Sequence, residues 1–182
     1  MSQELIKSTK DSMQKTLDAY AKEISTIKTG RANASILDLI KVEYYGFPTP
    51  LIEIATISTP EPRVIMIKPY EKESLSMISK AIQQSNLGLV PNSDGSVIRL
   101  NIPPLTEERR KEFVKLLGKL SEDAKVAIRN IRRRLNETIK KDKSIPEDQA
   151  KRDENEIQKV TDEFIKKIDA LQNSKEKEIT TI

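Results

Sequence analysis

One stretch of helical sequence carries a group of basic side chains, and these are the residues in the chain best suited to chemistry. They are Lys125, Arg129, Arg132 and Arg133, called the basic strip below. In an α-helix, at about 100° per residue, they span an arc of about 100°. From Ala124 to Asn136 the sequence holds no Asp or Glu. We therefore expect unneutralised, solvent-facing cations that bind phosphate, because the arginine fork can hold two oxygens at once.

The distribution of charge supports this interpretation better than the net charge of +4 does. Residues 106–143 carry thirteen basic and seven acidic side chains, whereas residues 144–182 are net negative by three and residues 30–105 are balanced at seven of each. A solvated face with no partner is the other reading of such a helix, but carboxylates four residues away normally balance it. A local basic patch is the footprint of a polyanion site.

The composition argues against most enzyme classes. The chain has no cysteine and no histidine, so it lacks thiolate and imidazole nucleophiles and the usual zinc ligands. No glycine-rich loop ends in Gly-Lys-Ser or Gly-Lys-Thr, and no group of carboxylates converges. We predict a binding protein, not an enzyme, with no metal and no cofactor.

The sequence also predicts where the protein works. No apolar run approaches the roughly 20 residues that cross a bilayer, and 33% of the residues are charged. The polar start, Met1 to Glu4, does not resemble a signal peptide. We expect a cytoplasmic protein with no membrane partner.

Three segments have the spacing of long amphipathic helices. Apolar residues recur mainly at intervals of three and four from Ile6 to Ile27, from Phe113 to Leu135 and from Ile157 to Ile179. Thr106, followed by two glutamates, is a predicted helix cap, and Pro146 marks the start of the last helix. A bundle of three helices follows, because an isolated helix of mixed composition is marginal.

The middle of the chain is predicted to be an inserted domain. We assign residues 1–30 and 105–182 to the bundle and 31–104 to a small β-rich domain with one helix, which makes the fold class α+β. The connections are a predicted hinge, because one contains a permissive glycine and the other two ring-locked prolines. The hinge residues are Gly30, Arg31, Pro103, Pro104 and Leu105.

The pattern within the insert predicts its elements. Strands are expected at 39–45, 51–58, 63–68 and 96–102, and a helix at 74–86. Gly46 to Pro50 and Leu87 to Ser93 are expected to be turns.

An ordered set of motifs resembles the bacterial ribosome recycling factor family over essentially the whole chain. The set includes Lys28-Thr29-Gly30-Arg31-Ala32, Val42-Glu43-Tyr44-Tyr45-Gly46, Leu87-Gly88-Leu89, Pro103-Pro104-Leu105-Thr106-Glu107-Glu108-Arg109-Arg110 and Arg129-Asn130-Ile131-Arg132-Arg133. Each motif alone is weak, but their order and spacing are specific.

The resemblance implies an L-shaped molecule that binds the post-termination ribosome and, with elongation factor G and GTP, splits the subunits to release mRNA and tRNA. It implies that Arg129, Arg132 and Arg133, with Arg31 near the hinge, contact 23S ribosomal RNA of the large subunit. It also implies that the β-rich domain meets elongation factor G and RNA of an inter-subunit bridge. We expect a monomer. A scaffold protein that binds a protein partner through the acidic third helix remains an alternative.

Overall fold

The computed structural model describes residues 2–181, and these fall into two units with separate cores. The helical unit consists of residues 2–29 and Thr106–Thr181, and the small unit of Gly30–Leu105. The chain therefore crosses between the units twice, after Thr29 and after Leu105. Within the described residues, no helix is long and apolar enough to span a membrane.

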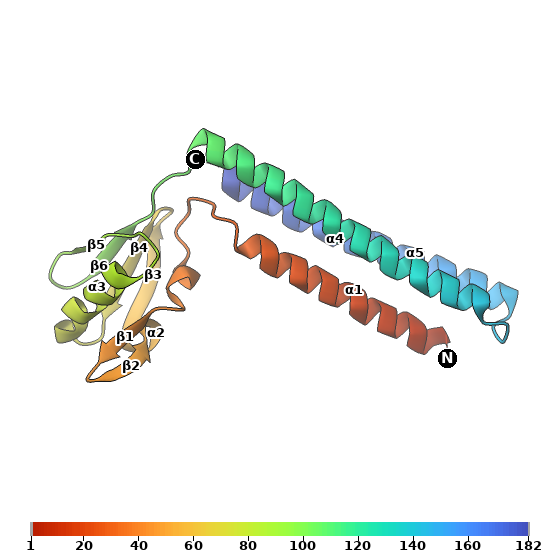
Figure 1. Cartoon of the computed structure of the whole chain (residues 1–182), viewed down its shortest axis with the longest axis horizontal. Coiled ribbons are helices and arrows are strands. Elements are labelled where there is room, and N and C mark those ends of the chain that lie inside the picture. Colours follow the sequence, from red (N-terminus) through yellow and green to blue (C-terminus); the bar gives the residue numbers. More distant parts are fainter. Residues whose placement is uncertain (1, 182) are drawn as a thin grey trace. The chain divides into compact units, whose positions relative to one another are not determined.

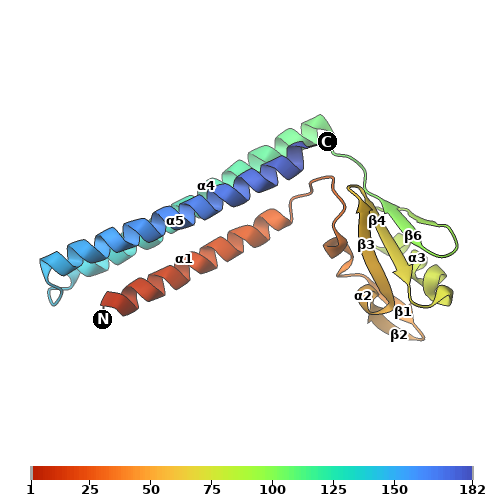
Figure 2. The same ribbon diagram turned by 180° about the vertical axis from the view of Figure 1, so that it is seen from behind.

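The helical unit is built from three long helices that pack lengthwise (Figures 1 and 2). They are α1 (Ser2–Ser25), α4 (Glu107–Lys141) and α5 (Glu147–Thr180), and each contacts the other two. The predicted apolar seams are confirmed, because Ile6, Ile128 and Ile168 are at most 1% exposed. Burying one such side chain contributes about 1.5–3 kcal/mol. The packing of these seams stabilises helices that would be marginal alone.

Local signals in the sequence set the helix ends. The Thr106 hydroxyl accepts a hydrogen bond from the Arg109 backbone N–H at 3.2 Å, which confirms the predicted cap of α4. Between α4 and α5, Asp142 Oδ1 accepts hydrogen bonds from the Ser144 N–H at 2.9 Å and hydroxyl at 2.6 Å. These bonds lower the pKa of the Asp142 carboxyl. Pro146 directly precedes α5, as predicted.

A polar contact inside the bundle fixes how α1 meets α4. Tyr20 and Ser121 are both buried, and their hydroxyls are hydrogen-bonded. The Ser121 hydroxyl also lies 2.8 Å from the carbonyl of Leu117, to which it donates. Burial raises the pKa of Tyr20. A buried hydroxyl without a partner is costly, so this contact favours one register of the two helices.

The small unit combines a sheet, a hairpin and one main helix. The helix is α3 (Leu75–Gln84), and the strands are β1 (Lys41–Tyr44), β2 (Phe47–Pro50), β3 (Ala55–Glu61), β4 (Val64–Pro69), β5 (Pro91–Ser93) and β6 (Ile98–Asn101). The sheet is antiparallel in the order β3-β4-β6-β5, and β1 pairs only with β2. Ile65, Ile67 and Ile98 of the sheet and Ile78 of α3 are fully buried together. The α+β class predicted from the sequence is confirmed.

The predicted strand 51–58 was wrong at its start. Leu51–Ile54 form a short helix, α2, and β3 begins only at Ala55. Leu51 and Ile54, three residues apart, are buried, while Ile52 between them is 63% exposed. This is helical spacing, but the segment is too short for periodicity to distinguish it from a strand.

The two predicted turns were also wrong in part, because each contains a strand. The hairpin turn between β1 and β2 consists only of Tyr45 and Gly46, both with positive φ (+49° and +83°). Phe47–Pro50 then form β2 despite two prolines, and Pro91–Ser93 form β5 at the sheet edge. Prolines are tolerated on strands whose N–H groups would face solvent.

Candidate nucleic-acid interface

All four residues of the basic strip lie on α4, but they do not share one environment. The buried residues of this helix include Ala124, Ile128 and Leu135. At about 100° per residue, Lys125 and Arg132 fall on the flank of that seam, whereas Arg129 and Arg133 point farther away from it. The flanking residues lie within reach of α5. The expectation that all four cations face solvent together was therefore wrong.

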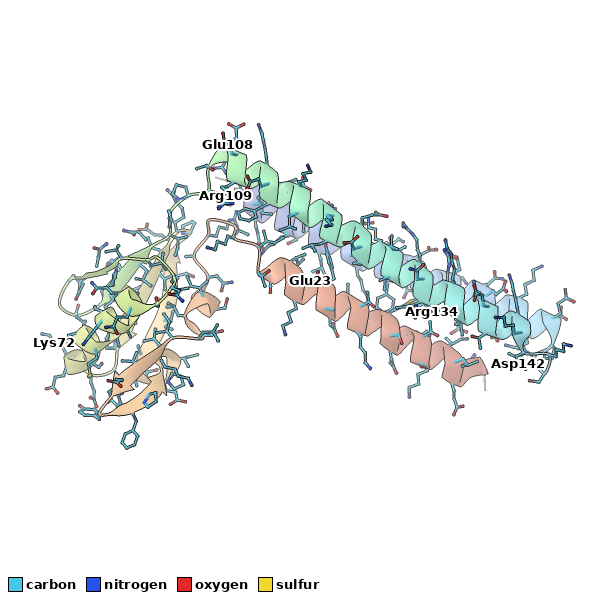
Figure 3. The ribbon with its side chains drawn as sticks, in the orientation of Figure 1. Glu23, Lys72, Glu108, Arg109, Arg134 and Asp142 are labelled. Atoms are coloured by element: carbon cyan, nitrogen blue, oxygen red, sulfur yellow. The ribbon has the colours of Figure 1, made fainter. Side chains whose placement is uncertain are left out.

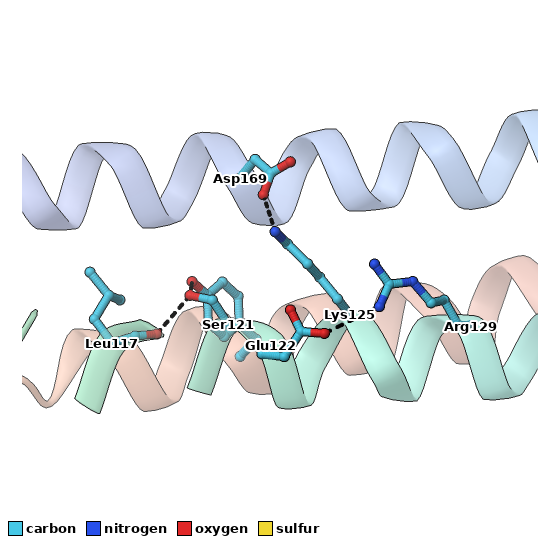
Figure 4. A network of polar contacts seen from close by, with 7 residues as sticks. Leu117, Ser121, Glu122, Lys125, Arg129 and Asp169 are labelled. Carbon is cyan, nitrogen blue, oxygen red and sulfur yellow. Dashed lines mark hydrogen bonds and ion pairs between the residues drawn. The ribbon is translucent and has the colours of Figure 1, made fainter. Parts of the chain in front are cut away.

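Lys125 is the most enclosed member of the strip. Its side chain is only 18% exposed, and its ammonium forms an ion pair with Asp169 of α5 (Figure 4). The sequence suggested no partner because Asp169 is 44 residues away along the chain. A cation held this closely by a carboxylate of its own molecule is a poor candidate for binding phosphate. We infer that the main role of Lys125 is to link α4 to α5 through this ion pair.

Arg129 also has a carboxylate partner, two turns earlier on the same helix. Its Nη1 lies 3.2 Å from Oε1 of Glu122. Figure 4 marks this ion pair with a dashed line. Glu122 lies seven residues before Arg129, outside the stretch from Ala124 to Asn136 and beyond the spacing of four at which a carboxylate normally balances a helical cation. The Arg129 side chain is still 42% exposed. A surface pair of this kind contributes about 0–1 kcal/mol, so an incoming phosphate can replace Glu122.

Arg132 and Arg133 keep their charge uncompensated. Arg132 Nη1 donates to the neutral Oε1 of Gln158 on α5 at 2.6 Å. That bond orients the guanidinium without cancelling its charge. Arg133 is exposed and forms no ion pair with any residue from 2 to 181. These two residues carry the free positive potential of the strip.

Arg134 adds a further cation to the surface of α4, although it is not among the four residues of the basic strip. It lies on α4 (Figure 3), is exposed, and has no ion-pair partner in the described part of the chain. The arc ended at Arg133 because Arg134 is turned a further 100° or so. The run of three arginines from Arg132 was the available signal. Together they cover much of the α4 surface that is not packed in the bundle.

Arg31 lies in the small unit, whereas the basic strip lies in the helical unit. Its side chain is exposed and follows Gly30, whose φ of +72° favours glycine. A Cβ on Gly30 would lie 3.2 Å from the backbone nitrogen of Leu105. Glycine therefore lets the outgoing and returning chain segments approach each other closely.

Both connecting segments are fastened to one turn of the small unit. The Ala32 N–H donates to the Pro62 carbonyl at 2.7 Å, and the Ile102 N–H donates to the next carbonyl, that of Arg63, at 2.8 Å. Pro103 and Pro104, which follow, are exposed. These anchors limit any freedom of the predicted hinge to the few residues outside Ala32 and Ile102.

The part of the chain from 2 to 181 contains no group of three His, Cys, Asp or Glu residues arranged to hold a metal ion. The surface of α4 is therefore cationic. Arg132, Arg133 and Arg134 have no carboxylate partner in the described chain, whereas Lys125 and Arg129 each form an ion pair.

Comparison with known proteins gives this face a context. The family model described as "Ribosome recycling factor" matches residues 20–180. The ribosome-recycling factor of Geobacillus sp. (strain WCH70) is 51% identical over 185 aligned residues that cover all of both chains. That of Synechocystis sp. is 57% identical and covers 95% of this chain and 97% of the relative.

Solved structures agree with the sequence comparison. A solution structure of the ribosome recycling factor matches with a TM-score of 0.78 and 41% identity, covering 100% of this chain and 98% of the other. A second match, with a TM-score of 0.64 and 45% identity, covers 98% of both chains. It describes the Thermus thermophilus factor and Escherichia coli elongation factor G bound to the Escherichia coli post-termination complex.

Proposed function

The chain belongs to the ribosome recycling factor family, and from that premise we propose that its α4 face binds ribosomal RNA of the large subunit. The factor acts on the post-termination ribosome with elongation factor G and GTP, and it splits the subunits so that mRNA and tRNA are released. We infer that it works in the cytoplasm as a monomer and that it catalyses no reaction itself.

One observation carries the proposed contact: Arg132 and Arg133 are cationic, accessible and uncompensated on a rigid helix. Arginine can donate two parallel hydrogen bonds to a phosphate. Contacts to the backbone of 23S RNA position a protein without reading its sequence. We assign Arg132 and Arg133 the central contacts, with Arg129 and Arg134 beside them.

Arg129 would take part by exchanging partners. In the free protein Glu122 holds its guanidinium at 3.2 Å. An RNA phosphate would displace this carboxylate, and Glu122 would then lie near the RNA as an unfavourable charge. Lys125 would keep its ion pair with Asp169 and so hold α4 against α5 without contacting the RNA. Arg31 would make a separate contact from the small unit.

We further propose that the two units are domains that move relative to each other when the factor works. The α4 face would hold the helical unit on the RNA while elongation factor G pushes the small unit. The moving joints would be Thr29–Arg31 and Pro103–Leu105, because Ala32 and Ile102 are already hydrogen-bonded within the small unit. The energy would come from the partner GTPase.

Co-sedimentation with purified large subunits over a range of salt concentrations tests the RNA contact. Phosphate contacts make the logarithm of affinity fall linearly with the logarithm of salt concentration. Arg132→Glu should weaken binding and flatten that slope, whereas Lys166→Glu, an exposed charge reversal on α5, should change both much less. Equal losses in the two variants would refute the assigned face. A salt-independent affinity would instead favour a protein partner.

A further inference from the structure

The two edges of the β1–β2 hairpin differ in their ability to pair with another strand. Leu51 N donates to the Ile40 carbonyl at 3.1 Å, which fixes the phase of the ladder. In that phase Lys41↔Pro50 and Glu43↔Pro48 are the pairs without mutual hydrogen bonds. The backbone groups of these four residues therefore point outward, away from the partner strand.

The outer edge of β2 is closed to strand addition. Its outward positions are Pro48 and Pro50, and proline has no N–H to donate. Proline on an edge strand is a common device against pairing with another chain. The two prolines cost the hairpin no hydrogen bond, because their positions do not face β1.

The outer edge of β1 has no such protection. Lys41 and Glu43 direct an N–H and a C=O outward, and the two-stranded sheet ends at β1. No other strand in residues 2–181 pairs with them. An unpaired edge of this kind is a template for another extended chain. The sequence blunts one edge of the hairpin and leaves the other open.

A groove lies along the open edge. It has a volume of about 810 Å³ and runs between β1 and α3, which pack against each other. Lys41 and Glu43 line one wall, and Met77, Lys80 and Gln84 of α3 line the other. A groove of this volume is within the range of binding sites, roughly 300–1,000 Å³. A strand bound here would pair with β1 and lie beside the helix.

The walls of the groove have the character of a peptide site. Apolar side chains from three segments line it, and Leu39 at its rim is 93% exposed. An extended segment turns alternate side chains to one side, so every second residue could contact these apolar groups.

The charges of the groove indicate what kind of segment fits. Lys41 and Lys80 are exposed, and neither forms an ion pair anywhere in the described chain. Glu43 is the only acidic residue in the lining. The surplus is positive, so acidic side chains in the occupant would be favoured.

We propose that this groove binds an extended, acidic segment of a partner protein, which adds to β1 as a third strand. Backbone hydrogen bonds to Lys41 and Glu43 supply the attachment, and apolar side chains against Leu39 and Met77 supply the selectivity. The site lies wholly in the small unit and does not depend on RNA binding by α4.

The test uses the full-length chain and a phage-displayed library of random nine-residue peptides. Peptides retained by the wild type and not by Glu43→Pro are synthesised and titrated. Glu43→Pro removes an outward N–H without removing a hydrogen bond to β2, so a peptide held by strand addition should bind it at least about tenfold more weakly. Glu43→Ala keeps that N–H and should bind within about twofold of the wild type.

Two further measurements make the outcome decisive. Amide chemical shifts of the ¹⁵N-labelled chain should change at Lys41 and Glu43 when the selected peptide is added, and Lys80→Glu should weaken binding about threefold or more. Lys80→Glu serves as the test if Glu43→Pro does not fold. Peptides that lack acidic residues, or equal losses in Glu43→Pro and Glu43→Ala, would overturn the proposal. So would a concentration-dependent dimer abolished by Glu43→Pro, because the edge would then bind a second copy.

Discussion

The helical unit and the small unit offer a partner different kinds of surface. The helical unit presents arginines on α4, and two members of the basic strip are already paired with its own carboxylates. The small unit has a balanced charge, an open strand edge and several exposed apolar side chains, including Leu39 and Phe47. Charge on a rigid rod suits RNA, which has a regular array of phosphates. An open edge with apolar walls suits a protein.

A cavity in one core should destabilise one unit and leave the other intact. Ile128 of α4 and Ile98 of β6 are both fully buried, each in a different core. Replacing either with alanine should cost about 2–5 kcal/mol because it leaves a cavity. In urea unfolding followed by circular dichroism, Ile128→Ala should lower the urea concentration at which the helical signal is lost. Ile98→Ala should leave that midpoint unchanged. Identical transitions in both variants would show that the units unfold as one.

The second prediction removes the charge that distinguishes the helical unit. Each charge-assisted hydrogen bond contributes about 1.5–3 kcal/mol, so Arg132→Glu with Arg133→Glu should reduce large-subunit affinity at least about 100-fold. Fold stability should change little, because Arg133 is exposed and the Arg132 side chain bonds only to Gln158 among residues 2–181. Filter binding gives the affinity, and thermal unfolding serves as the control. Unaltered affinity would leave the α4 face without a role.

The third prediction concerns the connection between the units. Gly30→Ala must adopt a φ of +72° and also place its Cβ 3.2 Å from Leu105 N. Gly88→Ala is the matched control, because its φ is +66° and nothing lies within 4 Å of the new Cβ. The left-handed backbone costs both variants about 1–2 kcal/mol. Gly30→Ala should lose more stability and also slow subunit splitting, measured by light scattering, while Gly88→Ala should split subunits at the wild-type rate.

The smallest expected effect concerns the carboxylate partner of Arg129. Glu122→Gln removes the carboxylate that holds this guanidinium, so affinity for the large subunit should rise about two- to threefold, as expected for a surface pair. Glu112→Gln, which breaks the similar pair with Arg109 near the start of α4, is the control and should have no such effect. Weaker binding by Glu122→Gln would mean that the carboxylate orients Arg129 productively.

Where the chain changes from helical to β-rich character could be predicted from residues near the boundary. Gly30 and the Pro103-Pro104 pair stand within two residues of the two crossings between units. The helix cap at Thr106 could be predicted for the same reason, since its hydroxyl accepts a hydrogen bond from an N–H only three residues away. The short elements α2, β2 and β5 were misread because three or four residues cannot establish a period.

The amino-acid sequence alone predicts three amphipathic helices, a β-rich segment between them and a concentration of arginine on α4. These follow from spacing and local chemistry, which act over a few residues. Which of these cations lack a carboxylate partner depends on how the helices pack. Asp169 and Gln158 both lie on α5. Asp169 forms an ion pair with Lys125 of α4, and Gln158 orients Arg132 of α4. Side chains far apart in the chain meet only when the seams of the helical unit pack. In the small unit, the order of the strands leaves one edge of the hairpin open beside α3.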